Sequence, residues 1–139
     1  MPTSASDAAG DLGAAIGAEL GMEHPEATQR FLESDPELFR RYVDFRGWVL
    51  ADGHIEKKTK LLMVVAVMCA LKHPDAINRY ASGAVVAGAS REEVQEACRV
   101  GVLFSGGPGL IAIADGLYGD SYPRTNFGPE HGSDPDPAG

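Results

Sequence analysis

The segment KHPDAINRY, residues 72–80, places a histidine, an aspartate, an arginine and a tyrosine within one short stretch of the chain. If Pro74 is the first residue of a helix, then His73, Ala76 and Tyr80 point roughly the same way, because seven residues make about two turns. Histidine titrates near neutrality, so His73 can act as a general acid or base. The Tyr80 hydroxyl can hold a developing oxyanion, and Ala76 leaves room for a small ligand. His73 and Tyr80 are therefore the predicted catalytic residues, and Ala76 a predicted substrate contact.

Three more residues are predicted to contact a substrate. Asp75 follows in the first helical turn. Arg79 can pair with a substrate carboxylate, although a structural ion pair is the simpler interpretation. Trp48 can form the wall of a pocket, and a core position is its alternative. The whole segment also has a simpler interpretation, in which KHPDA only connects two helices and His73 is exposed. Tyr80 is then a core residue whose hydroxyl end reaches solvent.

The composition argues against several classes of function. The chain has 139 residues, which is enough for one domain with a core of its own. Its net charge is −8 and its basic residues are scattered, so it has no electrostatic reason to bind nucleic acid or an anionic membrane. The N-terminus lacks the pattern of a secretory signal, and the longest apolar run, residues 61–71, is too short to span a bilayer. The sequence therefore predicts a soluble, cytoplasmic protein.

The residues that usually hold metals or cofactors are few and dispersed. Cys69 and Cys98 lie in apolar helical patterns, which favours buried free thiols over a disulfide. The histidines show no paired spacing, so no metal site is predicted. The segment SGGPG at 105–109 lacks the Lys-Ser/Thr ending of a phosphate loop and is typical of a turn into a helix. No cofactor is expected, and any chemistry would rest on side chains alone.

Apolar spacing and capping signals predict an all-α chain. Helices are expected over residues 11–20, 24–34, 35–50, 55–72, 74–88, 90–104 and 108–119, of which the first is weak. The strongest start signals are Asp35 as a cap and the capping box of Ser90 and Glu93. The helix over 55–72 becomes apolar all round, which indicates either a central helix or a subunit interface. A strand is the alternative for the β-branched part of this run.

The chain is expected to hold one folded domain between two tails. Residues 1–8 are small and polar and are predicted to form a disordered N-terminal tail. Residues 9–119 are predicted to form a single all-helical domain. Residues 120–139 are rich in proline, glycine and aspartate and are predicted to form an extended C-terminal tail. The segment with the candidate catalytic residues thus lies in the middle of the domain.

Four motifs follow one another over roughly residues 45–117: WVLADG, then IEKKTK at the start of an apolar helix, then AGASREEV, then LFSGGPGL before a last helix. In this order they resemble the carboxymuconolactone decarboxylase family, which also contains the alkylhydroperoxidase D-like (AhpD-like) proteins. The resemblance implies an all-α fold with a central helix hairpin and pockets beside it. It also implies obligate homo-oligomers, most often trimers or hexamers.

The resemblance further implies that reactive positions lie where the second helix of the hairpin begins. In the peroxidase branch these positions hold a Cys-x-x-Cys pair, a histidine and a glutamate, and counting from AGAS they fall here on Leu61, His73, Ala76 and Tyr80. None matches, and disulfide chemistry needs a pair of thiols, so the peroxidase mechanism does not carry over. The decarboxylase branch lacks the cysteine pair but uses the histidine, whose place Tyr80 takes. The implied protein keeps the family fold with a differently equipped pocket.

Two classes of function are therefore predicted. The first is a cofactor-independent lyase or isomerase that acts on a small organic acid or lactone by proton transfer and works as a homo-oligomer. The second is a non-catalytic oligomeric binding or scaffold protein on the same fold. A pocket lined by both His73 and Tyr80 would favour the enzyme, and a filled core at that place would favour the second class.

Overall fold

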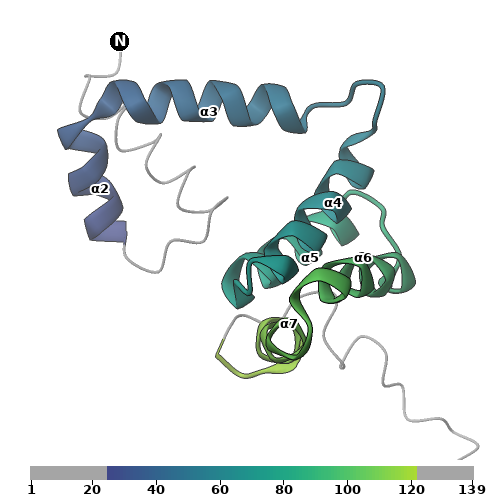
Figure 1. The fold of residues 1–139 in the computed structure, drawn as a ribbon. Helices are drawn as coiled ribbons and strands as arrows, with labels where there is room; N and C mark the ends of the chain where they lie inside the picture. Colours follow the sequence, from purple (N-terminus) through teal and green to yellow (C-terminus); the bar gives the residue numbers. More distant parts are fainter. Residues whose placement is uncertain (1–24, 122–139) are drawn as a thin grey trace, which may run out of the picture. The chain divides into compact units, whose positions relative to one another are not determined.

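The computed structural model describes residues 25–121, and each regular element in that range is helical (Figure 1). The chain divides between Ala51 and Asp52 into two compact units. The all-α class predicted from the sequence is confirmed. The alternative of a strand over residues 61–71 is wrong, because the helix α4 (Lys57–Ala70) covers nearly all of that run.

Some expectations concern residues outside the described range. These are the disordered tail over 1–8, the weak helix over 11–20 and nearly all of the extended tail over 120–139. The single domain expected over 9–119 stays a prediction.

The first unit contains α2 (Pro25–Ser34) and α3 (Pro36–Leu50), separated only by Asp35. The carboxylate Oδ1 of Asp35 accepts a hydrogen bond from the backbone N–H of Leu38 at 3.1 Å. Proline follows directly, where its fixed φ suits the first helical turn and its missing N–H is not needed. The start of α3 is therefore the one that the cap and the proline predict.

The described residues of the first unit have a small core. Leu32 and Phe39 are buried, and the Phe39 ring meets that of Phe31 edge-on with 4.9 Å between their centroids. The other apolar side chains of α3 are largely exposed and follow helical spacing: Leu38, Tyr42, Phe45 and Val49. An amphipathic helix usually buries such a stripe, and the described residues only partly cover the face of α3 that carries it.

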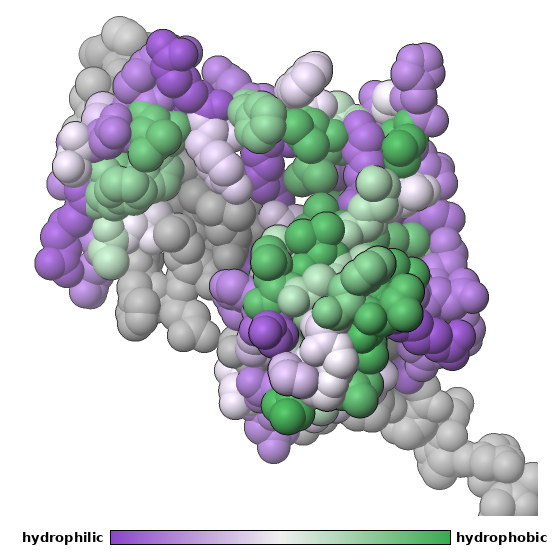
Figure 2. Space-filling view, viewed as in Figure 1, coloured by the Kyte–Doolittle hydropathy of each residue, from purple (hydrophilic) through white to green (hydrophobic). Residues whose placement is uncertain are grey.

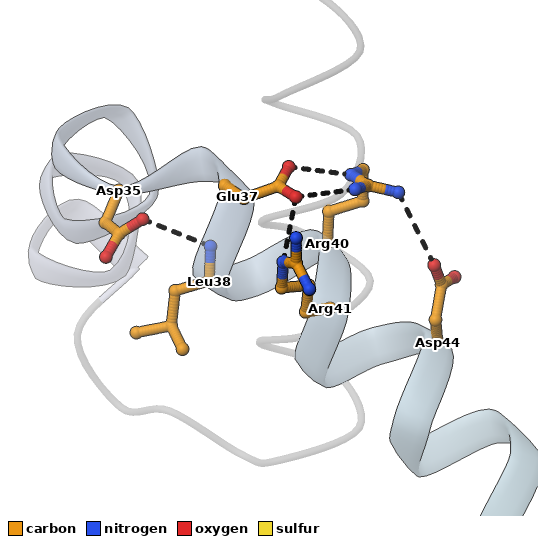
Figure 3. A network of polar contacts seen from close by, with 6 residues as sticks. All are labelled: Asp35, Glu37, Leu38, Arg40, Arg41 and Asp44. Carbon is orange, nitrogen blue, oxygen red and sulfur yellow. Dashed lines mark hydrogen bonds and ion pairs between the residues drawn. The ribbon is translucent and has the colours of Figure 1, made fainter.

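An ion network on the exposed side of α3 supports its first two turns (Figure 3). Glu37 Oε1 lies 2.6 Å from Arg40 Nη2 and 2.9 Å from Arg41 Nε, and Arg40 Nη1 lies 3.8 Å from Asp44 Oδ2. The hydrogen bond from Arg40, joined by Arg41, lowers the pKa of Glu37 from 4.5 to about 2. Any stabilisation from this carboxylate is therefore complete above pH 4.5 and is lost as pH falls toward 2. Since all four side chains are exposed, water screens these pairs and their contribution is small.

The second unit follows as five helical elements: α4, α5 (Pro74–Val86), α6 (Arg91–Ser105), α7 (Gly107–Ile113) and the π-helical turn η1 (Ala114–Tyr118). The capping box at α6 is confirmed, because Ser90 Oγ accepts from Glu93 N at 3.0 Å and Glu93 Oε1 accepts from Ser90 N at 3.1 Å. A single residue, Gly106 with φ +65°, separates α6 from α7. The π-helical turn was not expected from the sequence.

The helix α4 is shorter than the expected 55–72 at both ends, for local reasons. At its start, the carboxylate of Asp52 accepts a hydrogen bond from the N–H of Lys57 at 2.7 Å, which fixes the first turn there. At its end, Lys72 has φ +58°, a left-handed conformation that stops a helix.

The core of the second unit lies where α4 packs against α5 and α6. One face of α4 is buried, through Leu61, Val65 and Cys69 at helical spacing. The crossing with α6 is very close at Gly101, where an added Cβ would lie 2.5 Å from Cys69 Cβ and 2.6 Å from the Ala66 carbonyl oxygen. Only glycine allows two helix backbones to approach this closely.

A second face of α4 is not covered by the described residues. Met63, Val67 and Leu71 are each more than half exposed, although the helix is apolar all round. Three more apolar side chains at the end of α6 and in α7 are even more exposed: Leu103 at 76%, Phe104 at 81% and Ile111 at 72%. Figure 2 shows apolar residues gathered on the visible face of the unit that contains α4 to η1.

Candidate functional site

The elbow between α4 and α5 is a tight turn held by backbone hydrogen bonds to the last turn of α4. The N–H of Lys72 donates to the Cys69 carbonyl and the N–H of His73 donates to the Met68 carbonyl, each at 3.0 Å. These two hydrogen bonds, together with a left-handed conformation at the first of the two donor residues, form a Schellman motif. Glycine is the usual residue at that left-handed position. Lys72 instead holds that conformation, at φ +58°.

Replacing Lys72 with glycine should therefore stabilise the fold. A non-glycine residue in the left-handed region costs about 1 kcal/mol, and glycine removes that cost while losing part of the gain to chain entropy. We expect a gain of roughly 0.5 kcal/mol in the free energy of unfolding, measured by urea denaturation. Lys72→Ala is the matched control and should be no more stable than the parent. A Lys72→Gly protein less stable than Lys72→Ala would contradict this description of the turn.

His73 is the cap of α5, as the position of Pro74 predicted. Its Nδ1 accepts a hydrogen bond from the N–H of Ala76 at 3.2 Å, and its carbonyl accepts from the N–H of Ile77 at 3.0 Å. The side chain is exposed. With its backbone N–H on Met68, His73 uses three of its four polar groups to build the elbow.

The capping bond decides which nitrogen of His73 is available for chemistry. Because Nδ1 accepts from a backbone N–H, it holds a lone pair, and the proton of the neutral ring lies on Nε2. The free edge of the ring is thus a hydrogen-bond donor.

The first turn of α5 offers few amides to an anionic ligand. Pro74 has no N–H, Ala76 donates to His73 Nδ1, and Ile77 donates to the His73 carbonyl. A helix N-terminus binds anions through its unpaired N–H groups, and here most of them are already paired. A substrate carboxylate at this place would need a charged side chain instead.

Asp75 and Arg79 form an ion pair one helical turn apart. Asp75 Oδ1 lies 3.0 Å from Arg79 Nη2, and both side chains are at least three-quarters buried. The simpler interpretation from the sequence, a structural ion pair for Arg79, therefore agrees with the contact. The pair fixes the guanidinium of Arg79 on the surface of α5 that carries Asp75.

Ala76 and Tyr80 are half-buried on α5. The Tyr80 ring packs against the core cluster of the second unit. This position agrees with the interpretation of Tyr80 as a core residue whose hydroxyl end reaches solvent. The spacing that relates His73, Ala76 and Tyr80 is kept, because all three lie at the start or in the first two turns of one helix.

A contact that the sequence did not reveal fixes the start of α5 against η1. The buried Asn78 donates from Nδ2 to the Gly116 carbonyl at 2.8 Å. A Cβ at Gly116 would lie 2.5 Å from the Pro74 carbonyl oxygen, so the two backbones touch. Asn78 is close to the predicted site residues in sequence, but no pattern indicated that its partner would be a π-helical turn 38 residues later.

Trp48 lies on α3, in the first unit, with 76% of its surface exposed. It contacts Phe45 at 6.2 Å between ring centroids. Its alternative as a core residue is wrong within the described residues, since it is exposed. Its predicted contact with a substrate stays a prediction.

A pocket of about 270 Å³ opens between α6 and the α7–η1 segment. Its lining is almost entirely apolar, and none of the six residues predicted to act on or bind a substrate belongs to it. No pattern in the sequence indicated this pocket, because its walls are ordinary apolar residues of α6, α7 and η1, which meet only in the fold.

The thiols are not activated. Burial raises the pKa of Cys69, and burial next to Cys69 raises the pKa of Cys98 to about 11. Both are free and buried, as expected, with Cys69 Sγ donating to the Cys98 carbonyl at 3.6 Å. Since the thiolate is the reactive form, neither residue is prepared for thiol chemistry.

Within residues 25–121, no three His, Cys, Asp or Glu side chains gather in a way that could hold a metal ion. In the same range, no helix has the length and apolar character needed to cross a bilayer.

The described fold defines an all-α protein built on a helix hairpin, with a third helix packed on the hairpin and a polar elbow at its bend. The family model of the carboxymuconolactone decarboxylase family matches residues 36–115, more than half of the chain, and the chain belongs to that family. The resemblance noted over residues 45–117 is thereby confirmed and extends into α3.

A solved structure supports the same assignment. The chain is similar to the crystal structure of apo-lpg0406, a carboxymuconolactone decarboxylase family protein from Legionella pneumophila, with 27% sequence identity and a TM-score of 0.59. The match covers 79% of this chain and 91% of the other. No curated protein matches the chain. The comparisons thus give the family and the fold.

Proposed function

We propose that the chain is a cofactor-independent cytoplasmic enzyme of this family, a lyase or isomerase that acts on a small organic acid or lactone. The name of the family, carboxymuconolactone decarboxylase, points to a lactone that carries a carboxylate. The observation that carries the proposal is the hydrogen bond from Ala76 N to His73 Nδ1, because it holds an exposed imidazole with its Nε2–H free.

The chemistry that suits this arrangement is stabilisation of an oxyanion. Loss of carbon dioxide from a carboxylate leaves an electron pair, which moves onto a neighbouring carbonyl oxygen. The Nε2–H of His73 donates to that oxygen, and the Tyr80 hydroxyl can add a second hydrogen bond. The resulting enolate takes a proton from water, which completes the reaction. Isomerisation of a lactone double bond passes through the same kind of enolate after solvent hydroxide has removed a proton beside the double bond. Water then returns a proton to a different carbon and regenerates the hydroxide, so the same donors serve this reaction.

The remaining predicted residues have supporting roles in this proposal. Arg79, held by Asp75 at 3.0 Å, supplies the positive charge for the substrate carboxylate that the paired amides of α5 do not supply. Ala76 leaves space beside the ring of His73.

Incubation of the purified protein with a carboxymuconolactone tests the proposal, with release of carbon dioxide and loss of the lactone as the readouts. Failure to consume this lactone and a panel of related lactone acids would overturn it.

A second candidate function is a non-catalytic oligomeric binding or scaffold protein, and one observation favours it. His73 uses its N–H, carbonyl and Nδ1 to build the elbow, and Asp75 and Arg79 are engaged with each other. Groups that already have such roles in the fold need no catalytic role to explain their presence. A protein that consumes no lactone acid and yet assembles and binds a ligand would fit this second function.

We also propose that the chain works as a homo-oligomer, a trimer or a hexamer. The support is the exposed apolar surface, on α3, on the uncovered face of α4, and around Phe104 and Ile111. Soluble monomers rarely expose apolar patches of such extent. Light scattering at micromolar concentration should give three or six times the mass of one chain.

Charged substitutions in that surface should separate the subunits. The double variant Phe104→Asp and Ile111→Asp should lower the mass, whereas Val86→Asp, at an equally exposed apolar residue on α5, is the control and should keep it. A parent protein with the mass of a single chain would contradict the proposal.

A further inference from the structure

The pocket between α6 and the α7–η1 segment combines an apolar interior with a cation at its mouth. Its floor is formed by Cys98 and Leu117, which are 6% and 5% exposed. Val102 and Ile113 form half-buried walls, and the exposed Leu110 lies at the rim. The Cys98 thiol stays neutral because burial raises its pKa to about 11, so the floor carries no charge.

The polar groups lie only at the mouth. Arg99 is exposed and lines the pocket together with Gln95 and Tyr118. In the part of the chain that the structure describes, no carboxylate lies within ion-pair distance of the Arg99 guanidinium. An arginine without such a partner at the mouth of an apolar pocket can pair with one anionic group of a ligand. The net charge of −8 repels anions at long range, so this attraction is local to Arg99.

The wall of the pocket also contains the π-helical turn. Leu117 and Tyr118 belong to η1, and the backbone of the same turn is pressed against the start of α5 at Gly116. π-helical turns are rare and often occur at functional sites, where they reorient side chains. Here the turn points Leu117 into the pocket while Gly116 meets α5.

We propose that this pocket binds a small amphipathic monocarboxylate, with its apolar body between α6 and α7–η1 and its carboxylate on Arg99. A volume of about 270 Å³ lies just below the usual range for ligand sites and suits a small ligand with an apolar body of roughly eight carbon atoms. Arginine pairs with carboxylates through two parallel hydrogen bonds, and Gln95 can donate a third. A polyanion is disfavoured, because a single cation faces it within a chain of strong negative charge.

This site is separate from the one proposed for catalysis. Neither His73 nor Tyr80 lines the pocket, and the residues that do belong to α6, α7 and η1. The proposal therefore does not rest on the proposed reaction. A second copy of the chain, seated on the neighbouring exposed residues, is the competing occupant and is distinguished by the test.

The test is isothermal titration of the full chain with octanoate and, as its neutral match, 1-octanol. Octanoate should bind at least about tenfold more tightly than octanol, because only octanoate can form an ion pair with Arg99 through two parallel hydrogen bonds. Arg99→Gln should lower the affinity for octanoate at least about tenfold and leave the affinity for octanol unchanged. Arg91→Gln makes the same charge change on the same helix outside the pocket and should keep octanoate affinity within about twofold of the parent.

Two further variants complete the test. Val102→Phe, which fills the pocket, should abolish binding of both probes, and Leu110→Trp at the exposed rim serves the same purpose if Val102→Phe does not fold. His73→Asn should bind octanoate like the parent, so a failed reaction and a failed binding site are told apart. No octanoate binding at millimolar concentration, equal affinity for octanol, or parent-like binding by Arg99→Gln would overturn the proposal. A second copy of the chain would be the occupant if Val102→Phe changed the oligomeric mass and octanoate bound to neither protein. That result would also overturn the proposal.

Discussion

Gly101→Ala should destabilise the second unit by about 2 to 3 kcal/mol, the upper part of the range for overpacked cores. The new Cβ would lie 2.5 Å from Cys69 Cβ and 2.6 Å from the Ala66 carbonyl oxygen, where ordinary contacts begin near 3.4 Å. The backbone of α4 cannot move aside without lifting Leu61, Val65 and Cys69 out of the core. Urea denaturation followed by circular dichroism, at one fixed protein concentration, measures the change.

The matched control is the same substitution at Gly83, inside α5. A Cβ at Gly83 meets only Leu61 Cδ1 at 3.9 Å, which is an ordinary contact. Gly83→Ala should therefore raise stability by up to about 1 kcal/mol through helix propensity alone. Opposite signs for the two variants are the expected result. A Gly101→Ala protein as stable as Gly83→Ala would show that α4 and α6 do not cross as described.

Loss of the His73 ring should lower turnover of the lactone acid at least about a hundredfold, the range for losing one preorganised donor to an oxyanion. His73→Ala removes the donor and the cap together, and the lost cap costs about 1 kcal/mol of stability. His73→Asn keeps an acceptor for the Ala76 N–H. Its side chain is shorter than the imidazole ring, so no N–H donor remains at the position of Nε2. Both variants should lose activity, but only His73→Ala should lose stability.

Two other substitutions serve as comparisons for the activity of the His73 variants. His54→Asn makes the same change at an exposed histidine before α4 and should turn over like the parent. Tyr80→Phe should lower turnover by less than His73→Asn, because it removes one hydrogen bond and keeps the ring in the core. If His73→Asn were as active as the parent, the elbow would be only a turn and the chemistry would lie elsewhere or be absent.

Much of the fold follows from local signals in the sequence. The starts of α3 and α6 follow from Asp35 and from the capping box of Ser90 and Glu93, because these side chains bond to amides only three residues away. Hydrogen bonds between residues so close along the chain can be predicted from the sequence. The early stop of α4 was not predicted, since Lys72 adopts a left-handed conformation in which glycine is the usual residue.

The candidate site could be predicted only in part, for the same physical reason. The cap at His73 follows from Pro74 beside it, but the bond from Asn78 to Gly116 joins residues 38 positions apart. The pocket at Arg99 is formed by apolar residues of α6, α7 and η1, which look like ordinary core positions in the sequence. Tertiary packing decides which apolar positions are filled and which leave a space, and spacing along one helix does not contain that information.

The most direct test of the account is the position of the proton on the imidazole of His73. Long-range ¹⁵N–¹H correlation at neutral pH, assigned by comparison with His73→Asn, reports which ring nitrogen carries it. The capping bond from Ala76 N to Nδ1 predicts a proton on Nε2 and a bare Nδ1. A proton on Nδ1 would mean that the cap does not form and that Nε2 is free to act as a base, which would contradict the donor role proposed for His73.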